Sequence, residues 1–262
     1  MSSRRLAGKE KIAEAGVAEI PIWKEALFGA ELLLLLASPV YYGLGVPHGD
    51  DSAVVLIPGF LGSDLYLTQL NSWLGRMGYR PYDSGIEFNA ECPNLLIRTR
   101  LQETLELALR ETGGKVHLIG HSLGGVIARS IAGQRSRDIA SVITLASPFR
   151  GTIAHRSILR AAEVVRQQIL QEHSSNVLPE CFTSRCTCNF VESLRCRIPR
   201  NVMQTAIYTM DDGVVDWRCC RTGDPERDFQ VPGTHIGLAF NSSAYTVIAE
   251  RLAKASKPSF PR

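Results

Sequence analysis

A glycine-rich turn at residues 120–124 (GHSLG) constrains the fold of this chain more than any other segment. It directly follows the apolar run at 115–119 (KVHLI), which is typical of a buried strand, and it precedes a stretch at 124–133 that is typical of a helix. A strand that turns at once into a helix places Ser122 in a strained backbone conformation with its hydroxyl exposed above the strand. The flanking glycines let the neighbouring backbone approach without a clash. We therefore expect strand, turn and helix in that order, with Ser122 as a candidate nucleophile.

Further apolar runs alternate with helix-like stretches along most of the chain, which favours an α/β fold with a parallel sheet. The expected strands lie at 53–57, 80–86, 115–119, 140–145, 202–208 and 227–231, and the expected helices at 23–37, 64–77, 94–112, 124–133 and 242–255.

Two segments interrupt this alternation. Residues 1–50 precede the first evident strand, and residues 147–200 contain no clear strand. We interpret both as additions to a single domain that spans residues 1–262, because an insertion of this size between core strands usually covers a site or forms a small subdomain. The insertion carries apolar residues at near-helical spacing, which fits either a lid or a helix that covers the core: Ile158, Leu159, Ala162, Val165, Ile169 and Leu170.

The composition excludes several classes of protein. With 45% apolar and 21% charged residues, the chain has enough apolar material for a core and is not of the disordered type. A net charge of +3 is too small to indicate nucleic-acid binding, so we expect no nucleic-acid partner.

We expect no cleavable signal peptide of the usual kind in the N-terminal region, because its basic start is not followed by an apolar segment. Five leucines follow at 32–36, between Glu31 and Pro39. The wider apolar stretch at 27–47 has the length of a membrane span, but Pro39 near its middle disfavours a membrane-spanning helix. We expect a core helix at 23–37 that packs on the sheet, with an interfacial or signal-anchor helix as the alternative.

A serine is a weak nucleophile without a base, and the chain has only six histidines from which to choose one. In proteins with this kind of turn the order along the chain is serine, acid, histidine. Of the histidines after Ser122, only His235 lies beyond the last core strands, in a glycine-flanked loop before the final helix. His155 and His173 fall in the insertion, and His121 is expected to point away from Ser122 and to be structural. His48 and His117 precede the turn and lack supporting context.

The acid that orients this histidine should follow a strand between Ser122 and His235. Three carboxylates follow the strand at 202–208, namely Asp211, Asp212 and Asp216. Asp212 is favoured, because a turn residue and two β-branched residues that pack back into the core come after it. Asp211 and then Asp216 remain as alternatives.

Two backbone N–H groups are candidates for the oxyanion hole that acyl transfer requires. One belongs to Leu123, the residue after the nucleophile. The other belongs to Phe60, which follows Pro58-Gly59 at the end of the first core strand.

The seven cysteines form an odd number, so at least one thiol is free or pairs between chains. We prefer disulfides between the insertion and the loop at 219–220, with Cys92 as the unpaired residue. Such bonds would imply a secreted or periplasmic protein, whereas reduced thiols would fit the cytoplasm. The insertion holds four cysteines without paired zinc-knuckle spacing: Cys181, Cys186, Cys188 and Cys196.

Five segments together resemble the α/β-hydrolase superfamily, and more narrowly its lipase and esterase branch with a GHSLGG turn: LIPGFLGSD, LIGHSLGGVIAR, TLASPFRGT, YTMDDGVVDW and PGTHIGLAF. The resemblance covers about residues 53–255. Pro58 stands where small bacterial lipases have histidine, and Ala146 and Phe149 also depart from the lipase pattern.

The resemblance implies a mostly parallel sheet with helices on both faces and a lid-like insertion. It implies Ser122, Asp212 and His235 as a catalytic triad, Phe60 and Leu123 as oxyanion donors, and hydrolysis of carboxylic esters through an acyl-enzyme. No metal or organic cofactor is expected, and a lipid or small-molecule ester is the expected substrate, with transient contact to a lipid interface. An acyltransferase or thioesterase with the same triad, and a binding protein without catalysis, are the alternatives.

Overall fold

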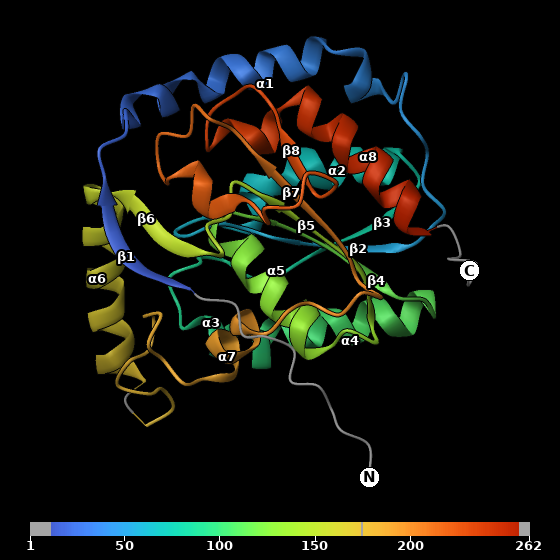
Figure 1. Cartoon of the computed structure of the whole chain (residues 1–262). Helices are drawn as coiled ribbons and strands as arrows, with labels where there is room; N and C mark the ends of the chain where they lie inside the picture. The colour runs from blue at the N-terminus through green and yellow to red at the C-terminus, as the bar shows by residue number, and fades with distance from the viewer. Residues whose placement is uncertain (1–11, 174, 257–262) are drawn as a thin grey trace.

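Six parallel strands form the central sheet of the computed structural model, which describes residues 12–173 and 175–256 (Figure 1). Their spatial order is β3-β2-β4-β5-β7-β8, so that the strand leading to Ser122 lies near the middle of the sheet. The bounds are β2 (Ala53–Ile57), β3 (Arg80–Asp83), β4 (Val116–His121), β5 (Ile139–Leu145), β7 (Met203–Tyr208) and β8 (Asp228–Gln230).

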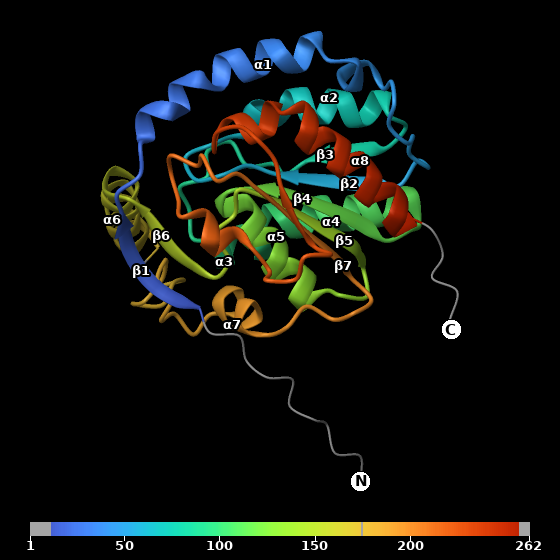
Figure 2. The same ribbon diagram turned by 45° about the horizontal axis from the view of Figure 1, so that its top comes forward.

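Helices cover both faces of this sheet (Figures 1 and 2), so its inner strands β2, β4, β5 and β7 are buried on both sides and are largely apolar, whereas the edge strands β3 and β8 are not. Alternate residues of β2 point into two separate cores: Val55 and Ile57 join one, and Val54 and Leu56 join the other. The first core lies under α3 (Pro93–Arg98), α4 (Arg100–Thr112), α5 (Leu123–Gln134) and α7 (Asn189–Arg195), and the second lies under α2 (Thr68–Arg76) and α8 (Ser242–Ser256). The expected α/β architecture is confirmed.

Two element boundaries differ from the sequence-based expectation for local reasons. The strand expected at 80–86 ends at Asp83, because the Asp64 carboxylate accepts the N–H groups of Ser84, Gly85 and Ile86 and takes them out of the ladder. The helix expected at 94–112 is divided at Thr99, whose φ of −115° and ψ of −101° are not helical.

The expectation of a core helix at 23–37 is wrong. A 3₁₀ helix η1 (Ile22–Leu27) leads into α1 (Phe28–Ala37), which lies as an outer layer over α2 and α8 (Figures 1 and 2). Both faces of the sheet are already covered, so only Leu35 of α1 is fully buried, while Leu33 and Leu34 are 68% and 69% exposed. Among the described residues, no helix has the length and apolar character needed to cross a bilayer.

The segment 147–200 contains a strand that its sequence did not reveal. β6 (Gly151–His155) pairs in parallel with β1 (Ala13–Ala18), apart from the central sheet. The pairing partner lies far away in the chain, and neither strand has a long apolar run, so local pattern gave no signal. The strand leads directly into α6 (Arg156–Glu172), and β1 ties the N-terminal region to this insertion.

Helix α6 buries its apolar residues in two places. Ile158 and Leu159 pack near Val214, whereas Val165 and Ile169 pack around Cys92, close to Phe60. The helix therefore connects the loop after β7 with the loop after β2.

The expected disulfides between the insertion and the loop at 219–220 are not formed, and all seven cysteines, which lie within the described residues, are free. Cys181 of the insertion is buried with its Sγ 3.0 Å from the Sγ of Cys92, the residue expected to be unpaired. Cys219 and Cys220 lie in η4 (Trp217–Cys220), and Cys220 belongs to the separate cluster around Tyr208. The hydrogen bond from the Cys181 thiol lowers the pKa of Cys92, which favours the thiolate that thiol–disulfide exchange requires.

We expect glutathione disulfide to oxidise Cys92 and Cys181 to a disulfide. The Cys92 thiolate attacks glutathione disulfide and releases one glutathione thiolate, which takes the proton of the Cys181 thiol. The resulting Cys181 thiolate then displaces the second glutathione. Intact mass should fall by two hydrogens, and peptide mapping should recover a linked Cys92–Cys181 pair. Cys196→Ser, at an exposed thiol, should leave this link intact, whereas Cys92→Ser should abolish it. Recovery of Cys181 linked to Cys219 or Cys220 would contradict the prediction.

Candidate active site

Ser122 occupies the turn between β4 and α5 in a strained conformation, with φ of 51° and ψ of −122°. Its N–H donates to the carbonyl of Leu145 on the neighbouring strand at 2.8 Å, which fixes the start of the turn. The turn is close-packed as well: a Cβ on Gly124 would lie 2.1 Å from the carbonyl oxygen of Ile57. The sequence around Ser122 thus folds as a sharp strand-to-helix turn that presents a serine at the carboxyl end of the sheet.

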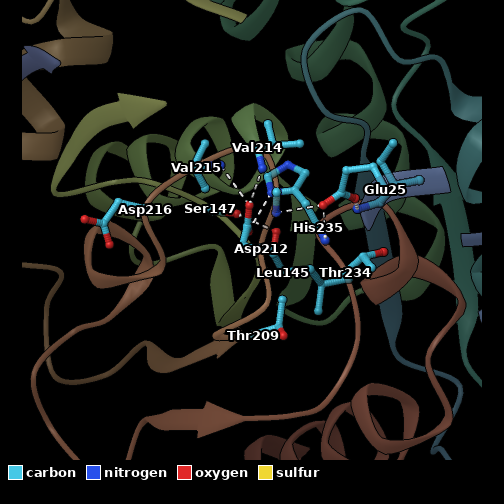
Figure 3. A network of polar contacts seen from close by, with 12 residues as sticks. Glu25, Leu145, Ser147, Thr209, Asp212, Val214, Val215, Asp216, Thr234 and His235 are labelled. Atoms are coloured by element: carbon cyan, nitrogen blue, oxygen red, sulfur yellow. Dashed lines mark hydrogen bonds and ion pairs between the residues drawn. The ribbon is translucent and has the colours of Figure 1, made fainter. Parts of the chain in front are cut away.

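Asp212 and His235 lie in contact in the loops that follow β7 and β8, and both side chains are almost completely buried. Asp212 Oδ2 is 2.7 Å from His235 Nδ1. The other carboxylate oxygen accepts the N–H groups of Val214 and Val215 at 2.9 and 2.8 Å (Figure 3). Since a carboxylate accepts and does not donate, Nδ1 carries the proton, and Nε2 of a neutral His235 is left as a base.

The two alternative acids lie elsewhere. Asp211 is paired with Lys24, and its side chain is 63% exposed. Asp216 accepts the N–H of Arg218 and so caps η4. Of the three carboxylates that the sequence left open, only Asp212 contacts His235.

Burial and neighbouring negative charges act on the pKa of His235 in opposite directions. Burial tends to lower the pKa of the imidazole, but the Asp212 carboxylate, through its charge and its hydrogen bond, and the charge of Glu25 together raise the pKa above its ordinary value. A base of raised pKa holds a transferred proton more firmly, which suits proton transfer from a serine.

His121 joins the serine turn to the histidine loop. Its Nε2–H donates to the carbonyl of His235 at 2.9 Å, and the two rings lie 5.0 Å apart in an edge-to-face arrangement. Burial lowers the pKa of His121 to about 3, so the ring stays neutral beside His235. Within residues 12–256 as described, the Ser122 hydroxyl makes no hydrogen bond to His235, and such bonds often tighten only when substrate is bound.

The loop after β2 lies beside Ser122. A Cβ on Gly59 would be 3.0 Å from the Ser122 Cβ. In the part of the chain that the structure describes, the N–H groups of Phe60 and Leu123 have no protein acceptor, as donors to an oxyanion require.

Asn89 holds this loop, although no feature of the sequence pointed to it. It is fully buried, its Nδ2 donates to the Pro58 carbonyl at 2.8 Å, and its backbone exchanges hydrogen bonds with Leu61 and Gly62. Its partners are backbone atoms, which leave no residue pattern to recognise.

The insertion lies over the same loop. The ring of Phe182 is 6.0 Å from that of Phe60, and Ser122 is only 9% exposed. The lid function of residues 147–200 stays a prediction. Among the described residues, no group of three or more His, Cys, Asp or Glu side chains is arranged to hold a metal ion.

Comparisons with known proteins agree with this architecture. The family model of the PGAP1-like alpha/beta domain matches residues 94–184. The chain is 29% identical over 134 residues to a triacylglycerol lipase of Burkholderia plantarii, covering 48% of this chain and 37% of that protein. It is 30% identical over 107 residues to a triacylglycerol lipase of Pseudarthrobacter phenanthrenivorans, covering 38% and 34%. The chain thus spans little more than a third of either relative.

Among solved structures, one of the metagenome-derived lipolytic enzymes LipS and LipT matches with a TM-score of 0.53 at 14% identity, over 81% of this chain and 96% of that one. The chain has the α/β-hydrolase fold. The resemblance to the lipase and esterase branch, expected from the five sequence segments, is confirmed.

We expect His235 to titrate above 6.5, its ordinary pKa, and the Asp212→Asn substitution to lower its pKa, because burial would then act without the neighbouring carboxylate. An NMR titration of the His235 ring measures this directly. Asp211→Asn removes the same charge from the adjacent exposed position and should leave the His235 titration unchanged. Equal effects of the two substitutions would contradict the assignment of Asp212 as the partner.

Proposed function

We propose that this protein hydrolyses carboxylic esters, with Ser122 as nucleophile, His235 as general base and acid, and Asp212 as the residue that orients His235. The observation that carries the proposal is the buried Asp212–His235 hydrogen bond of 2.7 Å, in loops that reach the strained Ser122 turn. The similarity to two proteins named triacylglycerol lipase supports the same chemistry.

In the acylation step, Ser122 Oγ forms a bond to the ester carbonyl carbon while its proton passes to His235 Nε2. The carbonyl π electrons move to the oxygen, which becomes an oxyanion held by the N–H groups of Phe60 and Leu123. The oxyanion then re-forms the carbonyl and expels the alcohol oxygen, which takes the proton from His235. Asp212 stabilises the imidazolium throughout and keeps Nε2 directed at the serine.

In the deacylation step, water takes the place of the alcohol. His235 Nε2 accepts a proton from water as the water oxygen attacks the acyl carbon, and the tetrahedral intermediate uses the same two N–H donors. Collapse releases the carboxylic acid, and the proton on His235 returns to Ser122 Oγ. The free enzyme is regenerated without any external reagent except water.

The surroundings of Phe60 support an apolar substrate. Val165, Ile169 and Phe182 of the insertion cluster around Phe60, so apolar side chains surround the oxyanion loop. Alkyl or aromatic acyl groups would gain from burial there. We therefore propose esters with apolar acyl chains, including lipid esters, as the substrates.

We expect Ser122→Ala to abolish turnover of p-nitrophenyl esters, by a factor of about 10⁴ or more, because the nucleophile is removed while the fold is kept. Wild-type protein should be labelled at Ser122 by a fluorophosphonate, and Ser122→Ala should not. An acyl-chain series from acetate to palmitate measures the preference for apolar substrates.

A matched control is Ser157→Ala, which changes an exposed serine in the first turn of α6 whose hydroxyl is hydrogen-bonded to the His155 ring. It should leave both turnover and labelling as in wild type. Absence of turnover with every ester, together with absence of fluorophosphonate labelling, would contradict the proposal. Transfer of the acyl group to an added alcohol in preference to water would instead favour an acyltransferase.

Asn89→Ala should lower kcat by about tenfold or more. Complete loss of one oxyanion donor lowers kcat by about 10²–10³-fold, and a less firmly held Phe60 loop should lose part of that stabilisation. Asn201→Ala serves as the control, since its side-chain amide also donates to a carbonyl, that of Ser136, but at an exposed position. Equal kcat values for the two variants, after correction for folded fraction, would exclude a role of Asn89 in the oxyanion loop.

A further inference from the structure

A buried carboxylate from the N-terminal region contacts both loops of the candidate site. Glu25 of η1 is 6% exposed and accepts three backbone N–H groups. Oε1 accepts from Gly213, beside the acid, at 2.8 Å and from His235 at 3.1 Å, and Oε2 accepts from Ile236 at 2.8 Å. One side chain therefore joins the loop of Asp212 to the loop of His235.

A second carboxylate secures the same histidine loop. Glu31 of α1 accepts the N–H of Thr234 at 2.9 Å and its hydroxyl at 2.6 Å. Two successive backbone N–H groups of this loop are therefore bonded to carboxylates of the N-terminal segment: that of Thr234 to Glu31 and that of His235 to Glu25. The two contacts of Glu31 hold α1 against the histidine loop.

Both loops are shaped to admit these carboxylates. A Cβ on Gly213 would lie 2.7 Å from Glu25 Oε1, and a Cβ on Gly237 would lie 1.6 Å from Glu31 Oε2. Any side chain at either glycine would displace the carboxylate or the loop. Gly213 and Gly237 therefore allow the N-terminal carboxylates to approach the two loops closely.

Several charged or titratable groups surround His235. Asp212 contacts its ring, and Glu25 accepts its backbone N–H (Figure 3). The neutral His121 ring packs against it from the serine turn, and Tyr66 donates its hydroxyl to the next carbonyl, that of Ile236. Glu25 is the negative group other than Asp212 that favours the charged form of His235.

We propose that Glu25 is a positioning residue for catalysis, which fixes His235 relative to Asp212 and stabilises the protonated imidazole formed during proton transfer. The inference rests on the proposed ester hydrolysis by Ser122, His235 and Asp212. It makes the N-terminal segment part of the site, although the sequence indicated only an extension before the first strand.

If Glu25 only holds the two loops together, removal of its charge should not change the pKa of His235. If it also stabilises the protonated imidazole, removal of the charge should lower that pKa. Glu25→Gln keeps the size of the side chain and an oxygen for Gly213 and His235, but removes the negative charge and places an amide against the Ile236 N–H. Glu25→Asp keeps the charge with a shorter reach. Glu19→Gln, on an exposed residue of the same segment, is the matched control.

The experiment compares these variants by NMR titration of the His235 ring and by the pH profile of kcat/KM with a p-nitrophenyl ester. We expect Glu25→Gln to lower the His235 pKa, to shift the acid limb of kcat/KM to lower pH in parallel, and to reduce kcat about tenfold with KM within twofold. Glu25→Asp should retain more of the wild-type pKa than Glu25→Gln, and Glu19→Gln should match wild type.

An unchanged His235 pKa and kcat in folded Glu25→Gln would overturn the proposal. If Glu25→Gln does not fold, an unchanged kcat in folded Glu25→Asp, whose shorter side chain cannot keep all three N–H contacts, would also overturn it. So would hydrogen exchange of the Gly213, His235 and Ile236 amides in wild type as fast as that of exposed amides. The titration needs no turnover, so a wild-type protein that cleaves no ester would refute the proposed function and still leave the Glu25 contact tested.

Discussion

A carboxylate and an imidazole can share a buried hydrogen bond only if the remaining lone pairs and N–H groups around them also find partners, since an unpaired buried charge is costly. Asp212 meets this requirement through the N–H groups of Val214 and Val215, and His235 through its backbone contacts to Glu25 and His121. The Asp212–His235 contact therefore depends on four segments of the chain. Each of them packs where it does in part because of this pair.

The parallel sheet determines where these segments meet. Strands β4, β5 and β7 are neighbours and run in one direction, so the turn at Ser122 and the loop at Asp212 lie at the same edge. The sheet alone does not bring His235 to that edge, because β8 is only three residues long and a loop separates it from His235. The two carboxylates of the N-terminal segment supply the contacts that the short strand lacks.

Residues with a local pattern could be predicted from the sequence. Ser122 stands between an apolar run and a helix, and His235 was selected because few histidines were available. Asp212 was favoured over its neighbours by the residues after it, and the structure brings it to His235. Asn89 and Glu25 could not be predicted, because their partners are backbone groups distant in the chain. The leucine run at 32–36 led to the wrong prediction of a core helix. Its apolar character is visible in the sequence, but the sequence does not show that other helices already cover both faces of the sheet (Figure 1).

The contacts of Glu25 also order events in time. Glu25 is synthesised before its three donors, which belong to residues 213, 235 and 236 and follow it by 188, 210 and 211 positions. Strand β1 likewise can pair only after β6 has been synthesised. The entropy cost of closing long loops makes contacts of such high sequence separation slow to form. The nascent chain can build most of its sheet before the histidine loop is synthesised, and the contacts of Glu25 with the site can form only after that loop has been added.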